Sequence, residues 1–227
     1  MPWNLVEILG SRCRPKELPV KCLAVALLVG VAIFPFGIKA GALGNQDRPK
    51  APNQGKQQPD YFPIALGNKW HLQFENNGVK TSGIMKVVKV ETAAGQTRAF
   101  LEMTMMGKKL PHDGQISTSA SGVFLHKLVP PVCLLKYPVK EGATWRVQSK
   151  SNGVEFLVVC TVGKWEQVEV PAGKFKAIKV RVEYEENVAP FTTDYWFAAD
   201  VGIVMLSTSS LKGTTKLTKF EKASDKK

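Results

Sequence analysis

A segment that occurs twice constrains the fold more than any other feature of this chain. Residues 62–79 (FPIALGNKWHLQFENNGV) and 137–154 (YPVKEGATWRVQSKSNGV) align at a constant offset with seven identities. About one identity would be expected by chance over such a window. The sequence therefore predicts an internal duplication, with two unrelated hairpins as the alternative. The identical pairs are Pro63/Pro138, Gly67/Gly142, Trp70/Trp145, Gln73/Gln148, Asn77/Asn152, Gly78/Gly153 and Val79/Val154.

Each copy of the segment combines residues that favour a β-hairpin. Proline cannot donate to a sheet ladder, so Pro63 and Pro138 suit the entry to a strand. The glycine four residues later permits a tight turn, and the following tryptophan provides a large apolar anchor. Asn-Gly is a strong signal for a type I′ turn, because both central positions of that turn need positive φ. We therefore expect Trp70 and Trp145 to be buried anchors on equivalent strands, each followed by an Asn-Gly hairpin.

The first 42 residues have the pattern of a targeting segment, which we expect to be a hydrophobic helix. Basic residues between positions 12 and 21 precede an apolar run at 22–38, and Ala40-Gly41-Ala42 offers a small-residue cleavage site. The positive flank favours export of the chain beyond the apolar run. The run is short for a membrane span and contains Pro35, which favours a cleaved signal peptide over a retained N-terminal membrane anchor. With either outcome we expect a periplasmic, cell-envelope or extracellular protein.

The composition beyond residue 42 predicts a linker followed by one folded domain. Residues 43–60 are rich in Pro, Gln, Asn and Gly without an apolar period, which is typical of a disordered linker. A single β domain is expected at 61–220, with repeated halves at 62–136 and 137–211. The last residues, 221–227, are expected to form a basic, solvated tail.

Alternating apolar residues predict that the domain is all-β. Short apolar stretches are separated by Gly and Asn turns, and no sustained helical stripe occurs beyond residue 43. We expect a curved antiparallel sheet, half-barrel or open barrel built from two similar halves rich in hairpins. Within it, 154–162 is apolar on both faces and is expected to be a central strand. Residues 214–220 are expected to supply an edge strand.

Charge and cysteine content indicate the kind of surroundings that the domain meets. The net charge is +12, with 31 Lys and Arg residues against 19 Asp and Glu residues. A basic surface favours anionic partners such as an anionic envelope surface, although net charge does not define a site. Because two of the four cysteines lie in the targeting segment, export leaves Cys133 and Cys160 as candidates for one disulfide. Two buried, unpaired thiols are the alternative.

No combination of residues predicts an active site, a metal site or a nucleotide site. His71, His112 and His126 lack the spacing of metal ligands, and no Cys-x-x-Cys is present. Neither a Gly-x-Ser-x-Gly motif nor a Gly-rich phosphate loop occurs. Lysines alternate with core residues along the expected strands, and no aromatic stacking platform accompanies them, which argues against nucleic acid as a partner. We therefore expect a non-enzymatic protein without a cofactor.

Four phrases of the domain resemble the TapB-like family of exported bacterial proteins and its relatives of unknown function. The resemblance covers nearly all of the expected globular part and rests on turn glycines, prolines and tryptophans. It implies a curved antiparallel sheet, such as the half-barrel of periplasmic lipoprotein carriers, and it brings no catalytic residues. Asp200 departs from the pattern, because Pro or Gly is expected there. The phrases are YFPIALGNKW (61–70), LLKYPVKEGATW (134–145), VEVPAGKFKAIKV (168–180) and YWFAADVGIVML (195–206).

Two functions are compatible with these features. The first is a non-enzymatic cell-envelope protein that binds a partner, either an envelope protein or a lipid, or that contributes to the envelope's structure. The second is a periplasmic carrier or chaperone that holds a lipid or a lipoprotein acyl chain against its curved sheet. Met103, Met105 and Phe156 are the candidates for lining such an apolar pocket. The alternative is that these three residues are ordinary core.

Overall fold

The computed structural model describes residues 58–227 apart from 111–113, 152, 186–189, 211 and 224–227. All regular secondary structure in this described part is β-strand. Among the described residues, no helix is long and apolar enough to span a bilayer. The expected targeting helix and nearly all of the expected linker lie outside the described residues. Residues 53–227 form a compact unit, and the hydrophobic core lies entirely within it.

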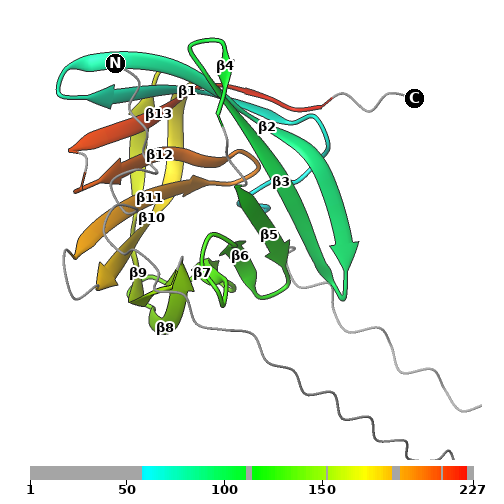
Figure 1. Cartoon of the computed structure of the whole chain (residues 1–227), viewed down its shortest axis with the longest axis vertical. Helices are drawn as coiled ribbons and strands as arrows, with labels where there is room; N and C mark the ends of the chain where they lie inside the picture. The colour runs from blue at the N-terminus through cyan, green and yellow to red at the C-terminus, as the bar shows by residue number, and fades with distance from the viewer. Residues whose placement is uncertain (1–57, 111–113, 152, 186–189, 211, 224–227) are drawn as a thin grey trace, which may run out of the picture. The chain divides into compact units, whose positions relative to one another are not determined.

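Thirteen strands form one antiparallel sheet that curves strongly across the domain (Figure 1). Its order is β7-β6-β5-β3-β2-β1-β13-β12-β11-β10-β9-β8, and the short β4 pairs with β3 alone. This arrangement confirms the prediction of an all-β, curved antiparallel sheet. The strands are β1 (Lys69–Asn76), β2 (Val79–Ala93), β3 (Gln96–Met105), β4 (Lys108–Lys109), β5 (Gln115–Ser119), β6 (Gly122–Leu125), β7 (Val132–Lys136), β8 (Thr144–Ser151), β9 (Val154–Val170), β10 (Gly173–Glu185), β11 (Phe191–Ala198), β12 (Gly202–Thr208) and β13 (Gly213–Glu221).

The two Asn-Gly segments have matching strand registers. In the β1–β2 hairpin Trp70 lies opposite Met85, and in the β8–β9 hairpin Trp145 lies opposite Cys160, at the same spacing. Asn77 and Gly78 have φ values of 50° and 78°. These positive values are those that a type I′ turn requires, which explains why Asn and Gly occupy the two positions.

The backbone that leads into each hairpin also has matching hydrogen bonds. Gly67 N–H donates to the Val87 carbonyl at 2.9 Å, and Gly142 N–H donates to the Val162 carbonyl at 2.9 Å. Both glycines have positive φ, 91° and 75° respectively, so a side chain would strain either turn. The equivalent glycines therefore occupy equivalent tight turns.

The sheet nearly closes on itself at a seam between its two edge strands, β7 and β8. Val129, just before β7, exchanges two backbone hydrogen bonds with Lys150 of β8, at 2.9 and 2.8 Å. The only other hydrogen bonds across the seam, among the described residues, come from side chains: Trp145 Nε1 donates to the Cys133 carbonyl at 2.8 Å, and Ser149 Oγ donates to the Pro130 carbonyl at 2.9 Å. By contrast, β1 pairs with β13 along the whole length of β1. The seam is therefore the weakest junction of the sheet.

An aromatic plug, consisting of Tyr61 and Phe62, fills one end of the curved sheet. Phe62 is fully buried and stacks on Trp70 with 5.0 Å between ring centroids. Tyr61 lies 6.0 Å from Tyr137 and 6.2 Å from Trp165, measured between ring centroids. The plug is secured by Asp200, whose N–H donates to the Asp60 carbonyl at 2.6 Å. We call this the plugged end, and we call the opposite end, where the turns after β1, β3 and β12 lie, the hairpin end.

The C-terminal strand occupies a different place from the expected one. β13 lies between β1 and β12, in the middle of the sheet, so the prediction of an edge strand at 214–220 is wrong. Its pairing with β1 joins residues far apart in sequence, such as Lys69 and Glu221. The strand includes Glu221, and Ala223 N–H donates to Asn68 Oδ1 at 2.7 Å, so the chain remains attached into the segment expected to be a tail.

Candidate binding face

The inner face of the curved sheet is apolar because side chains alternate along each strand. Trp70, Leu72 and Phe74 of β1 project from the same face, and the first two are buried. On β10, Val180 and Val182 are fully buried, whereas the alternate residues Lys179 and Arg181 project from the outer face. The alternation keeps the charges of these strands outside and an uncharged surface inside.

Burial along the inner face differs between the two ends. Trp70 and Phe197, near the plugged end, are fully buried. Towards the hairpin end, inward side chains such as Phe74, Leu206 and Phe191 are only partly buried, although they pack against the core. This partly exposed inner surface at the hairpin end is the candidate binding face.

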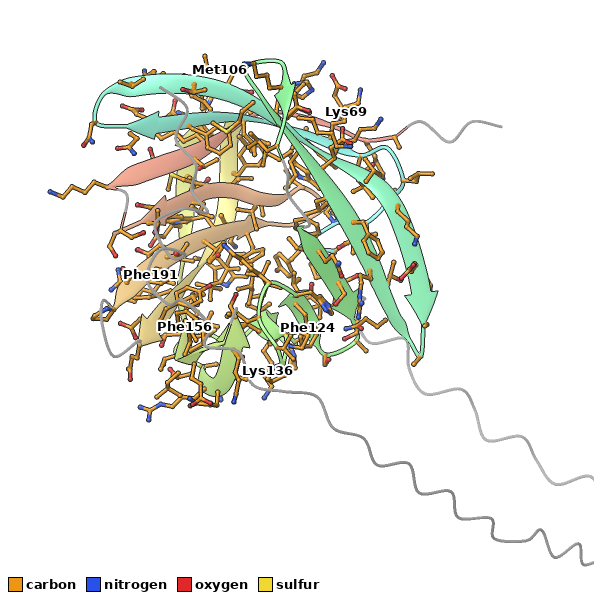
Figure 2. All side chains as sticks on the ribbon, viewed as in Figure 1. Lys69, Met106, Phe124, Lys136, Phe156 and Phe191 are labelled. Atoms are coloured by element: carbon orange, nitrogen blue, oxygen red, sulfur yellow. The ribbon has the colours of Figure 1, made fainter. Side chains whose placement is uncertain are left out.

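The predicted pocket residues lie on two strands that are not neighbours in the sheet. Met103 and Met105 lie on β3, and both are half-buried, whereas Phe156 lies on β9 and is buried in the core. Figure 2 shows Phe156 beside β8 and β9, well away from Met106 at the end of β3. The structure therefore places the two methionines on the inner face, with Met103 level with Trp70 and Met105 nearer the hairpin end. It places Phe156 in the packed interior of the other half.

Gly83 allows aromatic and methionine side chains to pack closely on the candidate binding face. A Cβ atom at Gly83 would lie 2.8 Å from Phe74 Cε2 and 3.1 Å from Met105 Cγ. The missing side chain thus leaves the space that Phe74 and Met105 fill. Methionine is flexible and adapts to irregular apolar partners, so this part of the face is suited to an apolar ligand.

The two repeated tryptophans differ in burial but bond in a reciprocal way. Trp70 is fully buried and its Nε1 donates to the Val201 carbonyl at 2.7 Å, so it links the first half of the domain to the second. Trp145 is half-buried and bonds in the opposite direction, to Cys133 of the first half. Trp145 is less covered because β8 is an edge strand. Of the paired prolines, Pro63 is buried and Pro138 is exposed.

The two cysteines lie on either side of the seam. Cys133 is half-buried on β7 and Cys160 is buried on β9, two strands that contact each other, and both are free thiols in the structure. Burial raises the pKa of Cys133 to about 11 and the pKa of Cys160 to about 12, and the neighbouring Cys133 contributes to the latter. Thiols with such values are protonated at neutral pH and are weak nucleophiles. The disulfide stays a prediction.

The structure brings together a serine and a histidine that the sequence did not link. Ser117 Oγ lies 2.7 Å from His126 Nε2, the geometry of a nucleophile and its base. However, Ser117 is fully buried and cannot meet a substrate in this conformation. Burial, followed by the charge of Arg98, lowers the pKa of His126, so the ring is held neutral. The backbone N–H of His126 also donates to the Gln115 carbonyl, and the two bonds therefore fix the loop after β6.

Of the two remaining histidines, His112 lies outside the described residues. His71 lies on the outer face, with its Nε2 atom 3.2 Å from Glu221 Oε1. Within residues 58–223, gaps aside, no group of three His, Cys, Asp or Glu side chains could hold a metal ion.

A network of charges covers the outer face of β10 and β11. Asp194 receives hydrogen bonds from Arg181 at 2.9 and 3.0 Å, and it lies 2.9 Å from Lys179 Nζ. Burial raises the pKa of Asp194, but these bonds outweigh burial and lower it overall. The Lys179 ammonium also lies 4.8 Å from the centre of the Trp196 ring. These interactions stabilise a solvated sheet surface and do not form a cleft site.

The fold resembles those of two solved structures. The first is described as a putative lipoprotein from Parabacteroides distasonis ATCC 8503; it has a TM-score of 0.51 and 15% identity, and the match covers 73% of this chain and 100% of that one. The second is described as a putative exported protein with YmcC-like fold from Bacteroides fragilis NCTC 9343, with a TM-score of 0.49, 16% identity and coverage of 72% and 100%. A comparison with protein-family models and with curated proteins gave no match. At 15% identity the first likeness shows a shared fold alone.

Proposed function

We propose that this chain is a non-enzymatic, exported cell-envelope protein that binds a partner or ligand through its β domain. The observation that supports binding is the asymmetry of the sheet. One end is filled by Tyr61 and Phe62, whereas the inner face at the hairpin end leaves apolar side chains partly exposed. An uncharged surface of this kind gains free energy when a partner removes it from water.

The proposed location rests on the sequence and on the fold. The basic and apolar residues before position 42 have the pattern of an export signal. The solved structure that shares the fold is described as a putative lipoprotein, which fits an envelope protein. The finer assignment to the TapB-like family is part of this proposal and rests on the four phrases alone.

A carrier of a lipid or an acylated peptide is the second candidate function. Phe74 and Met105 packed over Gly83, with Met103 on the same strand face, favour a flexible apolar ligand on the inner surface. Phe156 is not part of this proposed ligand site, because it is buried on another strand.

Native purification followed by mass spectrometry tests the proposed function. A defined envelope protein that co-purifies in stoichiometric amount would support the first candidate. A stoichiometric lipid or acylated peptide would support the carrier. Turnover of a substrate that is abolished by changing a single residue of the domain would contradict both candidates, because neither includes catalysis.

We also propose that Cys133 and Cys160 form a disulfide after export. Their thiols would lose two protons and two electrons to a thiol–disulfide oxidoreductase of the exported compartment. We expect Cys133 and Cys160 of protein from its native compartment to resist alkylation when the protein is denatured without reductant, and the peptides that contain them to be two hydrogens lighter when linked than when reduced. The bond would add about 2–4 kcal/mol to the free energy of unfolding by restricting the unfolded chain. Alkylation of both Cys133 and Cys160 in that protein would contradict the pairing.

A further inference from the structure

The turn between β3 and β4 has a residue that its backbone does not favour. Met106 and Gly107 have φ values of 49° and 74°, close to the 50° and 78° of Asn77 and Gly78. In a turn of this type the first position favours Asn, Asp or Gly, and a side chain such as methionine is strained there. Met106 is 81% exposed, so packing does not compensate for the strain. Folding alone therefore does not explain a methionine at this position.

Other turns at the hairpin end also carry exposed apolar and basic residues. Val79, beside the Asn-Gly turn, is 67% exposed. Asn76 pairs with Val79 on one side and with Gly213 on the other, so the β12–β13 turn lies beside the β1–β2 turn. The β3–β4 turn lies three residues further along β2, where Met106 backbone N–H donates to the Ser82 carbonyl at 3.4 Å. We call this surface the turn rim; it consists of Val79, Lys80, Met106, Lys108, Lys109 and Lys212.

The turn rim combines exposed apolar tips with positive charge that is mostly unpaired. Of the ion pairs formed by the described residues, only the one between Lys109 and Glu102 involves the rim. Lys80, Lys108 and Lys212 are exposed and belong to no ion pair within the described residues. The described chain enters the domain at the plugged end, near Asp60, so the rim lies at the end away from that entry.

We propose that the turn rim docks on the surface of an anionic phospholipid bilayer. Exposed apolar side chains at turn tips can enter the boundary between headgroups and acyl chains, while lysines approach the lipid phosphates. A stable protein interface buries about 800 Å² on each partner, whereas the exposed large apolar residues of the rim are only Val79 and Met106. The inference rests on the proposed envelope location, and it brings the partly exposed inner face close to the membrane surface.

Sedimentation with lipid vesicles tests the proposal on residues 53–227, the unit that contains the whole core. Vesicles of phosphatidylcholine alone are compared with vesicles that contain an equal part of phosphatidylglycerol. We expect binding only to the anionic vesicles, and weaker binding as salt is raised. Removing three lysines together (Lys80→Gln, Lys108→Gln and Lys212→Gln) should weaken binding roughly a hundredfold, since each lysine near the surface contributes about fivefold.

Met106→Asn separates membrane binding from folding. Asparagine suits the positive φ of 49°, so this variant should melt at the same temperature as the wild type or higher. Vesicle binding should nevertheless fall about tenfold, because the apolar tip is lost. A matched control removes three exposed lysines elsewhere, Lys136→Gln, Lys140→Gln and Lys164→Gln, and it should bind as the wild type does.

Three results of the vesicle assay would overturn the proposal. They are wild-type binding that does not depend on anionic lipid, equal losses in the rim and control lysine variants, and full binding by Met106→Asn. An acidic protein captured through the rim in place of vesicles would also overturn it. None of these results decides whether the chain is exported or which molecule co-purifies with it, so failure here can be told apart from failure of the proposed function.

Discussion

Trp70→Ala is expected to lower the free energy of unfolding by about 3–5 kcal/mol, as large aromatic deletions in cores do. Trp70 is fully buried and lies between Phe62 and Phe220, with ring centroids at 5.0 and 5.2 Å. Its indole N–H also joins the two halves of the domain through the Val201 carbonyl. Removing the ring would leave a cavity where the plug, β1 and β13 meet. Denaturant unfolding of residues 53–227 measures this loss.

Two further variants distinguish the parts played by the ring and the hydrogen bond. Trp70→Phe keeps an aromatic ring but loses the bond to Val201, and we expect a loss of about 1–3 kcal/mol for the carbonyl left unpaired. Trp145→Ala should cost less than Trp70→Ala, because Trp145 is only half-buried on the edge strand β8. If Trp70→Ala cost less than about 1 kcal/mol, the tryptophan would not be an anchor, because surface substitutions stay within that range.

Local signals account for the parts of the fold that could be predicted from the sequence. Asn77-Gly78 requires positive φ at both positions and is flanked by alternating apolar residues, so the hairpin is specified by neighbours in sequence. The place of a strand within the sheet is not specified in this way. Residues 213–221 have the same alternation whether the strand is central or at an edge. Their pairing with β1, as between Trp70 and Phe220, depends on contacts across the whole domain.

For the candidate sites, too, the sequence predicts which residues share a face of one strand but not which strands lie together. Met103 and Met105 share a face because they are two residues apart on one strand, and this spacing can be seen in the sequence. Phe156 has the same apolar character, but only the order of the strands shows that it packs in the other half of the sheet. The bond between Ser117 and His126 likewise joins β5 to the loop after β6 and has no local signal.

The turn rim could be recognised only by combining the sequence with the backbone geometry. A Gly that follows a short alternating strand indicates a turn, so Met106-Gly107 could have been recognised as one. The sequence does not show that Met106 has positive φ or that it is 81% exposed. These two observations together separate a residue retained for packing from one that projects into solvent at the cost of strain.

Gly122→Ala is the second substitution for which we expect a large effect, about 4 kcal/mol in the free energy of unfolding. Gly122 begins β6 with φ 148°, and a Cβ atom there would lie 2.2 Å from the carbonyl oxygen of Leu135 and 3.1 Å from Cys133 Sγ. The obstructing atom belongs to the backbone of β7, so it cannot turn aside as a flexible side chain would. Backbone strain adds about 1–3 kcal/mol and overpacking a similar amount.

A matched glycine separates the collision from the backbone strain. Gly95 has φ 73° and nothing within 4 Å of its added Cβ, so Gly95→Ala should cost only about 1–2 kcal/mol for the left-handed conformation. Because the collision at Gly122 pushes β7 out of place, the substitution should also disturb the seam, where Trp145 bonds to the Cys133 carbonyl. Intrinsic tryptophan fluorescence of the folded variants is the readout for that change. Equal losses for the two alanine variants, with unchanged fluorescence, would contradict the close approach of β6 and β7.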